Sequence, residues 1–443
     1  MPPALPDSLV SLLSLLRSAF TAPSFDTFCW LVHGFIGRVG EHTITGVWQA
    51  ARLAGVLHHS RGHDFFARRR WSADRLGLAL AGFVVGRFLA PGAPIPVAID
   101  DTLFPRTGPK VFAAGWHFES PAPRRARPRL RFGNSFVCLG LLVRLQGRAV
   151  CLPLLFRLWR PAEGDAEQVT RVALAHELIA RLAERFPDRA IAVAADAYYA
   201  NKSLRRLPER VSACVRLRSN AAMWGLPPEP PAGRPGRPRT KGQRLGSVRE
   251  LGADPGRRWG ELRIATAAGE ARRLEAIVLD CLWYKVLGAR PVRVVIAREP
   301  GQPERPLLAV LSTDPELSAA EILRRFAERW AIEVAFAEAK GQLGVGEARN
   351  RAPAAVERTV PFGFLCRALV LLWYALHGDP HTDVARHRER APWYRQKHTP
   401  SFADMLAALR RELIRAEFRA ESATAPSRPE NDALSLAAQV LQA

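Results

Sequence analysis

The sequence predicts a mixed α/β protein: a β-sheet with helices on its faces, preceded by a helical region and interrupted by a β-rich insertion. Three observations support this fold class. Residues 1–90 carry the apolar spacing of helices, and residues 95–217 alternate short apolar strands with one helical segment. Residues 260–313 contain only strand patterns, and helical spacing resumes at Ser318. A sheet flanked by helices is the architecture that this order favours.

The composition indicates a globular protein with a polyanionic partner. With 443 residues and 48% hydrophobic content, the chain can bury a large core. Its formal net charge of +22 favours nucleic acid as the partner, ahead of an acidic membrane surface.

Cysteine usage and apolar runs predict a soluble protein of a reducing compartment. The six cysteines are scattered, and no pair has zinc-finger or Cys-x-x-Cys spacing, so we expect buried reduced thiols. The early run LVSLLSLL follows Asp7 and lacks the basic segment of a signal peptide. The apolar stretches at 76–89 and 360–376 are short and contain Arg87 and Arg367, so neither is expected to span a membrane.

The N-terminal region is predicted to be a set of helices. They are LVSLLSLLRSAF, FDTFCWLVHGFIGRV, TGVWQAARLAG and SADRLGLALAGFVVGRFL, the last with Ser72 as its N-cap. The histidines of HHSRGHD (58–64) could suggest zinc, but no partner spacing supports such a site. We expect a polar surface loop there.

The strands that follow predict the sheet. Expected strands are 95–100, 134–145, 148–158, 189–196 and 210–217, with a hairpin at Gln146-Gly147 and a helix at 166–186. An exposed Pro- and Gly-rich loop is predicted at 227–244, followed by strands at 260–267, 271–279, 292–298 and 306–313. Ser318 and Glu321 have the spacing of a capping box at the start of the next helix.

The segment FAERWAIEVAFAEAK (326–340) places charges within an apolar face. At 100° per residue, Arg329, Glu333 and Lys340 project at about 300°, 340° and 320°, with apolar residues on both sides of this stripe. The alternative is an i,i+4 ion pair on a solvated face, against which the apolar flanks argue.

Three acids are positioned to form a metal site. Asp100 and Asp196 each end a predicted strand, and Glu333 lies on the helical stripe. Carboxylates at strand ends converge at one edge of an α/β sheet, and a helix packed there can add a third. Such oxygen ligands suit Mg²⁺ or Mn²⁺, and two such ions can drive phosphodiester chemistry. The alternative for Asp196 is an ordinary turn residue after its strand.

The order of these residues resembles a known family. Phe326, Arg329, Glu333 and Lys340 match the spacing Tyr-x2-Arg-x3-Glu-x6-Lys of bacterial insertion-sequence transposases of the DDE class, whose catalytic core is ribonuclease H-like. The resemblance extends to VAIDDT (97–102), AADAYYANKSL (195–205) and ERWAIEVAFAEAKGQLGVGEARNR (328–351). It runs from about residue 20 to about 415, and a β-rich insertion at 218–313 also fits the family.

The resemblance implies roles for individual residues. Asp100, Asp196 and Glu333 would be the catalytic metal ligands for two Mg²⁺ ions, with Mn²⁺ able to substitute, and Arg329 and Lys340 would contact DNA phosphates. Asp100 is preferred to Asp101 because the family pattern is Asp-x-Thr. Phe326 stands where the family has Tyr, so that hydroxyl is missing here.

The resemblance also implies the function and the domain layout. The chain would be a DNA transposase that nicks the ends of its own mobile element and joins them to target DNA, acting as a homodimer in the bacterial cytoplasm with no membrane or nucleotide cofactor. The implied domains are a helical DNA-end-binding region at 1–90, a catalytic core at 91–217 and 314–378, an insertion at 218–313 and a helical region at 379–443. Two alternatives are a structure-specific nuclease with the same ribonuclease H-like fold and a non-catalytic DNA-binding protein derived from a transposase.

Basic segments add candidate DNA contacts. GRPGRPRTKGQR (233–244) resembles an AT-hook core, so Arg237 and Arg239 are candidates for the minor groove, although a solvated linker explains the same composition. RRARPRLR (124–131) and FARRRW (66–71) could contact phosphates or simply be solvated. Trp283 lies among apolar residues, so we expect it in the core.

Overall fold

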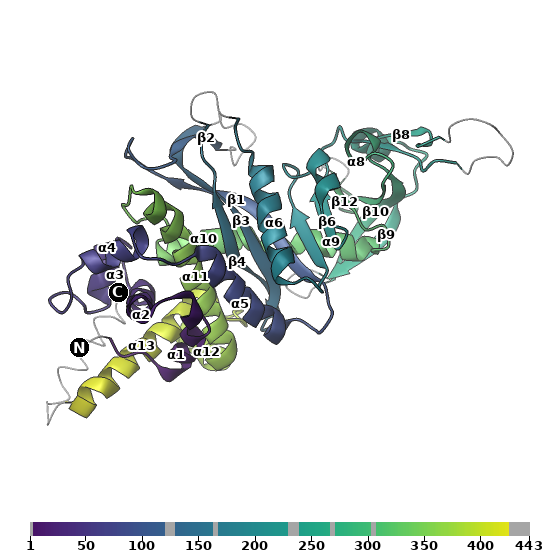
Figure 1. Ribbon diagram of the computed structural model, residues 1–443. Helices are drawn as coiled ribbons and strands as arrows, with labels where there is room; N and C mark the ends of the chain where they lie inside the picture. Colours follow the sequence, from purple (N-terminus) through teal and green to yellow (C-terminus); the bar gives the residue numbers. More distant parts are fainter. Residues whose placement is uncertain are drawn as a thin grey trace.

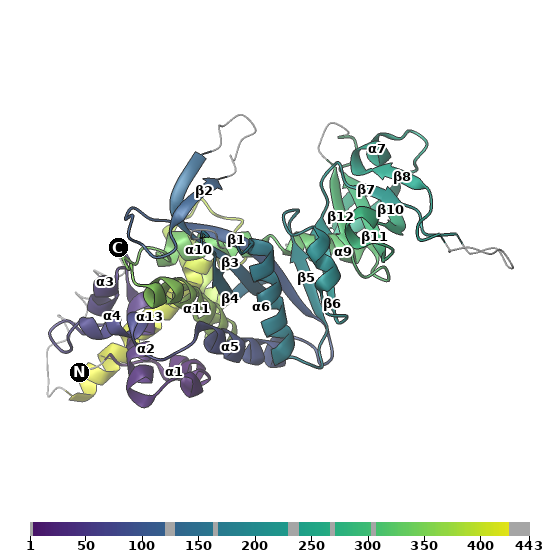
Figure 2. The same cartoon turned by 45° about the horizontal axis from the view of Figure 1, so that its top comes forward.

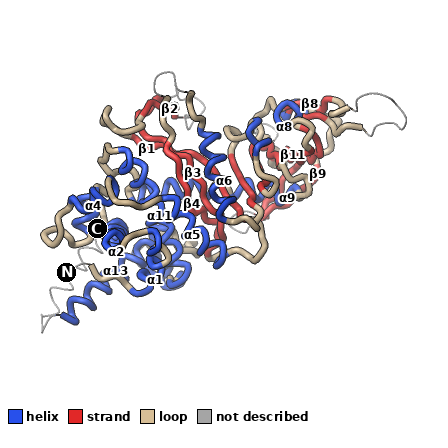
Figure 3. Tube along the Cα trace, viewed as in Figure 1, coloured by secondary structure: helices blue, strands red, loops and turns tan. Residues whose placement is uncertain are grey.

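The structure is a computed structural model that describes residues 3–119, 129–162, 167–228, 239–265, 271–302 and 307–424. A long mixed sheet runs through the molecule, with a helical body at one end and the strands of the insertion at the other (Figures 1 and 3). This arrangement agrees with the predicted α/β class and is consistent with a ribonuclease H-like fold.

The helical body combines both ends of the chain. Its N-terminal helices are α1 (Asp7–Ser14), η1 (Arg17–Ala19, a 3₁₀ turn), α2 (Ala22–Gly37), α3 (Ile44–Ala50), α4 (Ser60–Ala67) and α5 (Ala73–Phe88). Its C-terminal helices are α11 (Pro353–His377), α12 (Pro380–Arg390) and α13 (Phe402–Thr424). The buried helix α11 contacts α1, α2, α4, α5 and α13, so it joins the two groups into one body.

The strands of the core and of the insertion belong to one sheet. The core contributes β1 (Ile95–Pro105), β2 (Gly115–Glu119), β3 (Arg129–Leu145), β4 (Arg148–Leu158), β5 (Ile191–Ala195) and β6 (Val211–Arg216). The insertion contributes β7 (Ala222–Trp224), β8 (Arg244–Ser247), β9 (Gly260–Ala265), β10 (Ala271–Leu282), β11 (Pro291–Arg298) and β12 (Leu308–Ser312). The order is β2-β3-β1-β5-β6-β12-β11-β10-β7-β8, with β4 beside β3 and β9 beside β10.

Parallel pairing is confined to the centre of the core. Strand β5 runs parallel to both β1 and β6, whereas the other paired strands are antiparallel. The insertion joins the core where β12 pairs with β6, through the partners Ser312 and Cys214. The strands of the insertion therefore extend the sheet of the core.

The remaining helices cover the sheet or connect its strands. They are α6 (Arg171–Arg185), η2 (Lys202–Arg206, a 3₁₀ turn), α7 (Val248–Ala253), α8 (Tyr284–Leu287), α9 (Ala319–Glu328) and α10 (Ala331–Leu343). Helix α6 contacts β3 and β4, and α10 contacts β4 and β1. Figure 2 shows α6 lying along the core strands, with the insertion beyond β5 and β6.

The structure corrects several expectations about local elements. HHSRGHD lies partly in a helix, since α4 begins at Ser60. The side chain of Ser318 caps α9, but Glu321 binds Arg324 and Arg325 instead of closing a capping box. Strands β2, β7 and β8 and helices α7 and α8 were not predicted, because short segments give little periodicity.

One helix has the length and apolar composition of a membrane span. This is α11, but 89% of its most apolar window is buried inside the protein. Arg367 within it binds Glu338 and the carbonyl oxygen of Cys151. Helix α11 is therefore the central helix of the helical body.

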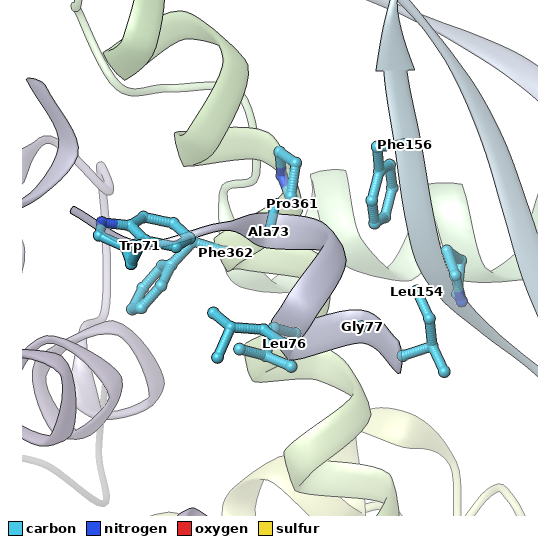
Figure 4. Close-up of a pocket in the computed structure, with 10 residues that line it drawn as sticks. Trp71, Ala73, Leu76, Gly77, Leu154, Phe156, Pro361 and Phe362 are labelled. Atoms are coloured by element: carbon cyan, nitrogen blue, oxygen red, sulfur yellow. The ribbon is translucent and has the colours of Figure 1, made fainter. Parts of the chain in front are cut away.

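Helix α5 attaches the helical body to the sheet through a glycine. A Cβ on Gly77 would lie 2.0 Å from the carbonyl oxygen of Leu154 in β4. Figure 4 shows this junction, where Gly77 lies beside Leu154 and Leu76 lies near Phe362, around an apolar crevice of only about 10 Å³. The close approach of backbone to backbone sets the distance between α5 and the sheet.

Two glycine substitutions in α5 test this packing. We expect Gly77→Ala to lower the free energy of unfolding by about 1–3 kcal/mol, because its methyl group has no space. Gly86→Ala is the matched control, since nothing lies within 4 Å of a Cβ there. It should raise stability by up to about 1 kcal/mol through helix propensity. Urea unfolding monitored by circular dichroism measures both; equal effects of the two substitutions would contradict this packing.

Candidate active site

The first two acids lie where the parallel pairing of the sheet ends. Strands β1 and β5 pair in register up to Ile99 and Ala195, and the next residues are Asp100 and Asp196. Neighbouring strands are about 4.8 Å apart, so the two backbones bring these carboxylates to one edge. Asp100 does not end its strand as expected, because β1 continues to Pro105 along β3.

The register also separates Asp100 from Asp101. Asp100 pairs with Cys138, which pairs with Phe156, and Phe156 stacks on Phe364 of α11. Asp101 pairs with Val137, which pairs with Arg157, and on this opposite face Arg157 binds Glu177 of α6. Directly opposed residues share a face of a sheet, so Asp100 faces the side of α10 and α11 and Asp101 the side of α6.

A single guanidinium connects Asp100 to Glu333. Arg329 donates from Nη1 to Oδ2 of Asp100 (3.0 Å) and from Nη2 to Oε1 of Glu333 (2.8 Å). Arg329 is only 9% exposed, so this bridge lies largely out of water. Arg329 and Glu333 of the predicted stripe therefore lie together with Asp100 at the edge of the sheet.

The stripe is not carried by one continuous helix. The amides of Arg329 and Trp330 bond to the carbonyls three residues back, and this tight turn separates α9 from α10. Glu328, just before the turn, is held by Arg144 of β3 (2.8 Å) and Arg324 (2.7 Å). These contacts fix the turn from which Arg329 reaches the acids.

The turn changes one of the expected apolar flanks. Ile332 and Phe336 are buried against the core, but Trp330 is 60% exposed and Ala337 is also exposed. The charged stripe consequently lies at the boundary between the core and solvent. A boundary position leaves the acids within reach of a substrate.

Lys340 lies on the same edge of the sheet, further along β1 than Asp100. Its Nζ donates to Oγ1 of Thr102 (2.6 Å) and to the carbonyl oxygen of Leu103 (2.9 Å). It also lies 4.8 Å from the centroid of the Phe104 ring. Lys340 thus follows β1 beyond Asp100, while the ring of Phe326 lies 5.5 Å from the guanidinium carbon of Arg329.

Burial changes the acid–base behaviour of the cluster. It raises the pKa of Asp100 to about 7, opposed by the Arg329 guanidinium and reinforced by Asp101 and Asp196. Burial also raises the pKa of Asp101, opposed by Arg171. The pKa of the Tyr199 hydroxyl rises through burial and the charges of Asp101, Asp100 and Asp196.

Asp196 also has the local role that the alternative interpretation gave it. Its Oδ1 accepts from the amide of Tyr198 (2.8 Å), which forms an Asx turn after β5. This bond fixes the start of the turn and leaves the second carboxylate oxygen for other partners. The turn and the site are therefore compatible.

The donor set suits a hard divalent cation, but the acids are not arranged around one. Among the described residues, which include all three acids, no group of three His, Cys, Asp or Glu side chains could hold a metal ion. The Arg329 guanidinium lies between Asp100 and Glu333, where a metal ion would otherwise lie. Carboxylate oxygens fit Mg²⁺ or Mn²⁺, provided that this guanidinium moves away.

The remaining sequence candidates lie away from this edge or outside the described residues. Arg239 is exposed within the insertion, whereas Arg237 and residues 124–128 lie outside the described residues. Trp283 is buried, as predicted. Sequence reasoning missed Arg171 and Tyr199, for which no local pattern gave a signal.

One comparison with known proteins identifies the family. The sequence model of the DDE superfamily endonucleases matches residues 23–280, more than half of the chain. The match includes Asp100 and Asp196 and ends before Glu333. A search of curated proteins finds no match to this sequence.

Replacing Asp100 tests its electrostatic environment. Because its pKa is raised from 3.8 to about 7, the folded protein holds a proton that the unfolded chain has lost between these pH values, so stability falls as pH rises. We expect Asp100→Asn to stabilise the protein by roughly 1–3 kcal/mol at pH 8, after the lost Arg329 bridge offsets part of the effect, and by much less at pH 4. Denaturant unfolding at both pH values measures this, and a pH-independent effect would contradict it.

Proposed function

Because the chain belongs to the DDE superfamily of endonucleases, we propose that it is the transposase of a mobile element, which cuts the ends of its own element and joins them to target DNA. The observation that carries the proposal is the position of Glu333, held to Asp100 by Arg329 beside Asp196. Three carboxylates and two cations at one edge of the sheet are suited to phosphoryl transfer.

Asp100, Asp196 and Glu333 would hold two divalent ions, Mg²⁺ or Mn²⁺. Such ions lower the pKa of a bound water and stabilise the leaving oxygen of a phosphodiester. Asp100 must be ionised to act as a ligand, and its raised pKa makes this the step that depends on pH near neutrality. We therefore expect activity to increase from pH 6 to pH 8.

The cations of the stripe would position the DNA strand. Arg329, once released from Asp100, would bind a phosphate next to the scissile bond, and Lys340 would hold the strand further along β1. The protein would thus contribute placement and charge, which are the main requirements of phosphoryl transfer.

The proposed substrate and assembly follow from the same function. The substrates would be the terminal inverted repeats of the element and a target duplex, with the N-terminal helices reading the ends. Two copies of the chain would hold two ends together in the bacterial cytoplasm. The large positive charge supports tight, salt-sensitive binding to DNA.

The proposal is tested by measuring the cleavage of a DNA duplex that carries an element end and is labelled on one strand. The probe is a duplex carrying the inverted repeat that flanks the gene, with Mg²⁺. We expect Glu333→Gln to reduce nicking at least roughly 100-fold, the equivalent of about 3 kcal/mol of transition-state stabilisation. Glu184→Gln is the matched control, because Glu184 is an exposed residue of α6 that pairs with Arg181.

Other results would favour the alternatives. Nicking that persists in Glu333→Gln would sink the assignment of the third acid. Cutting of branched DNA regardless of its end sequence would indicate a structure-specific nuclease. Tight DNA binding without metal-dependent cutting would indicate a non-catalytic DNA-binding protein.

The bridge formed by Arg329 predicts a specific effect on metal affinity. Since the guanidinium stands between two ligands, Arg329→Ala should bind Mn²⁺ roughly tenfold more tightly than the wild type in the absence of DNA at pH 8. The same variant should cut DNA more slowly, because a phosphate contact is lost. Calorimetric titration measures the affinity, with Arg325→Ala as the control that changes a neighbouring cation bound to Glu321. Unchanged Mn²⁺ affinity in Arg329→Ala would contradict the role of the bridge.

A further inference from the structure

Each acid of the doublet Asp100-Asp101 has its own arginine, on its own face of the sheet. Arg329 pairs with Asp100 from the side of α10, with Nη1 3.0 Å from Oδ2. Arg171, the first residue of α6, pairs with Asp101 from the other side, with Nε 3.4 Å from Oδ2. Neighbouring residues of a strand point to opposite faces, so each arginine serves one acid of the doublet.

Arg171 is held by several segments of the core on the α6 side. Its Nε donates to Oγ of Ser135 in β3 (3.3 Å), and its Nη2 lies 2.9 Å from Nδ1 of His117 in β2. The guanidinium carbon also lies 5.1 Å from the centroid of the ring of Trp159, the residue directly after β4. Together with Asp101 in β1, one side chain therefore contacts four segments of the core.

The bond between Arg171 and His117 has a defined direction. A guanidinium only donates, so Nδ1 of His117 accepts and the ring proton lies on Nε2. That nitrogen donates to the carbonyl oxygen of Gly133 (3.2 Å). Burial lowers the pKa of His117, and the charge of Arg171 acts in the same direction, which favours this neutral form. The buried imidazole therefore fixes the orientation of the guanidinium of Arg171.

Arg329 has fewer contacts. Its two ion pairs go to the candidate ligands Asp100 and Glu333, and its Nε is buried without a partner among the described residues. The ring of Phe326, whose centroid is 5.5 Å from the guanidinium carbon, adds one contact. A metal ion that binds these acids would replace both ion pairs of Arg329, whereas Arg171 would keep its contacts with the α6 side. Arg329 is thus the counter-ion that can leave.

The backbone connects Asp101 to Asp100. The amide of Asp101 donates to Oδ1 of Asp100 (2.9 Å), while Oδ2 of Asp100 accepts from Arg329. When Arg329 leaves, Oδ2 becomes available and Oδ1 keeps its bond to the amide. The peptide orientation that supplies this bond depends on Asp101 staying on the α6 side.

We propose that Arg171 is a positioning residue, which keeps Asp101 on the α6 side so that Asp100 alone of the doublet holds metal. Arg171 acts through Asp101 and touches neither the DNA nor the ions. This proposal rests on the proposed function, because it concerns the metal ligands of the same site. Asp100 has the counter-ion that can leave, and Asp101 has the counter-ion that stays.

Removing Arg171 should have opposite effects on metal binding and on cutting. The charge of Asp196 acts on Asp101 as well as on Asp100. A carboxylate of Asp101 without its counter-ion would therefore compete with Asp100 for an ion beside Asp196. The extra negative charge strengthens metal binding, whereas an ion held in the wrong position slows the reaction of the scissile bond.

The test is a double-mutant cycle of Arg171→Gln and Asp101→Asn, with Mn²⁺ as the probe. Calorimetric titration at pH 8 without DNA measures the Mn²⁺ affinity, and single-turnover nicking of an element end with Mg²⁺ measures the rate. We expect Arg171→Gln to bind Mn²⁺ at least roughly threefold more tightly and to nick roughly tenfold more slowly. Its affinity for DNA should stay within about twofold of the wild type, because Arg171 does not contact DNA.

The second substitution decides whether Arg171 acts through Asp101. Adding Asp101→Asn to Arg171→Gln should remove the gain in Mn²⁺ affinity and restore nicking to within about threefold of the wild type. The competing carboxylate is then gone, and the amide that holds Asp100 remains. Arg171→Lys keeps the charge without the planar contacts, so it should lie between the wild type and Arg171→Gln.

An arginine of the same helix provides the matched control. Arg181 is an exposed residue of α6 that pairs with Glu184. Arg181→Gln removes the same charge from α6 and should change neither the Mn²⁺ affinity nor the rate of nicking. Urea unfolding of each variant measures any loss of stability separately from these two values.

Three outcomes would overturn the proposal. Mn²⁺ binding that is absent from the wild type, or lost in Asp101→Asn alone, would contradict the assignment of Asp100 as the ligand. Mn²⁺ affinity and nicking that both fall in Arg171→Gln, and that Asp101→Asn does not restore, would indicate a purely structural role. Failure of the proposed function is seen separately, as absent nicking of element ends by a protein that still shows the expected cycle of Mn²⁺ affinities.

Discussion

The bridge from Arg329 to Asp100 and Glu333 is the interaction on which the candidate site depends. It joins Asp100 in the centre of the sheet to two residues far along the chain. Arg329 is 229 positions and Glu333 is 233 positions after Asp100. The turn between α9 and α10 makes the bridge possible, because it brings Arg329 to the sheet while Trp330 turns to solvent. Without that turn, Arg329 and Trp330 would continue one straight helix, and Arg329 would not be brought to the sheet.

The bridge also balances charges that the fold forces together. The parallel pairing of β1 with β5 brings Asp100 and Asp196 to one edge, where burial and mutual repulsion favour protonation. A cation among them lowers this cost, and in the described arrangement the cation is a guanidinium. A site that must be filled by positive charge is stable only with a counter-ion, whether that ion comes from the chain or from solution.

Much of this organisation could be predicted from the sequence, and the exceptions have physical reasons. Local periodicity predicts the order of the strands along the chain and the shared stripe of Arg329 and Glu333. It also places Asp100 and Asp196 near the points where the pairing of β1 with β5 ends. The continuation of β1 past Asp100 could not be predicted, because it depends on pairing with β3 some 30 residues away. Likewise, the break after Glu328 depends on Arg144 in another strand, and no property of the helical segment itself encodes that contact.

The charged residues beyond Asp100 extend this balance of charges to a longer stretch of the edge. Asp100, Lys340 and Arg106 follow one another along this strand and its neighbouring helix, so charge changes from negative to positive within a short distance. Under the proposed function, negative charge would concentrate metal ions at the reacting bond, whereas positive charge would concentrate the phosphates that flank it. A DNA strand laid along β1 would meet both in sequence. Under the proposed function, the direction of β1 would set the direction of the strand. Gly346 lets the loop between α10 and α11 lie over Phe104, near the end of β1.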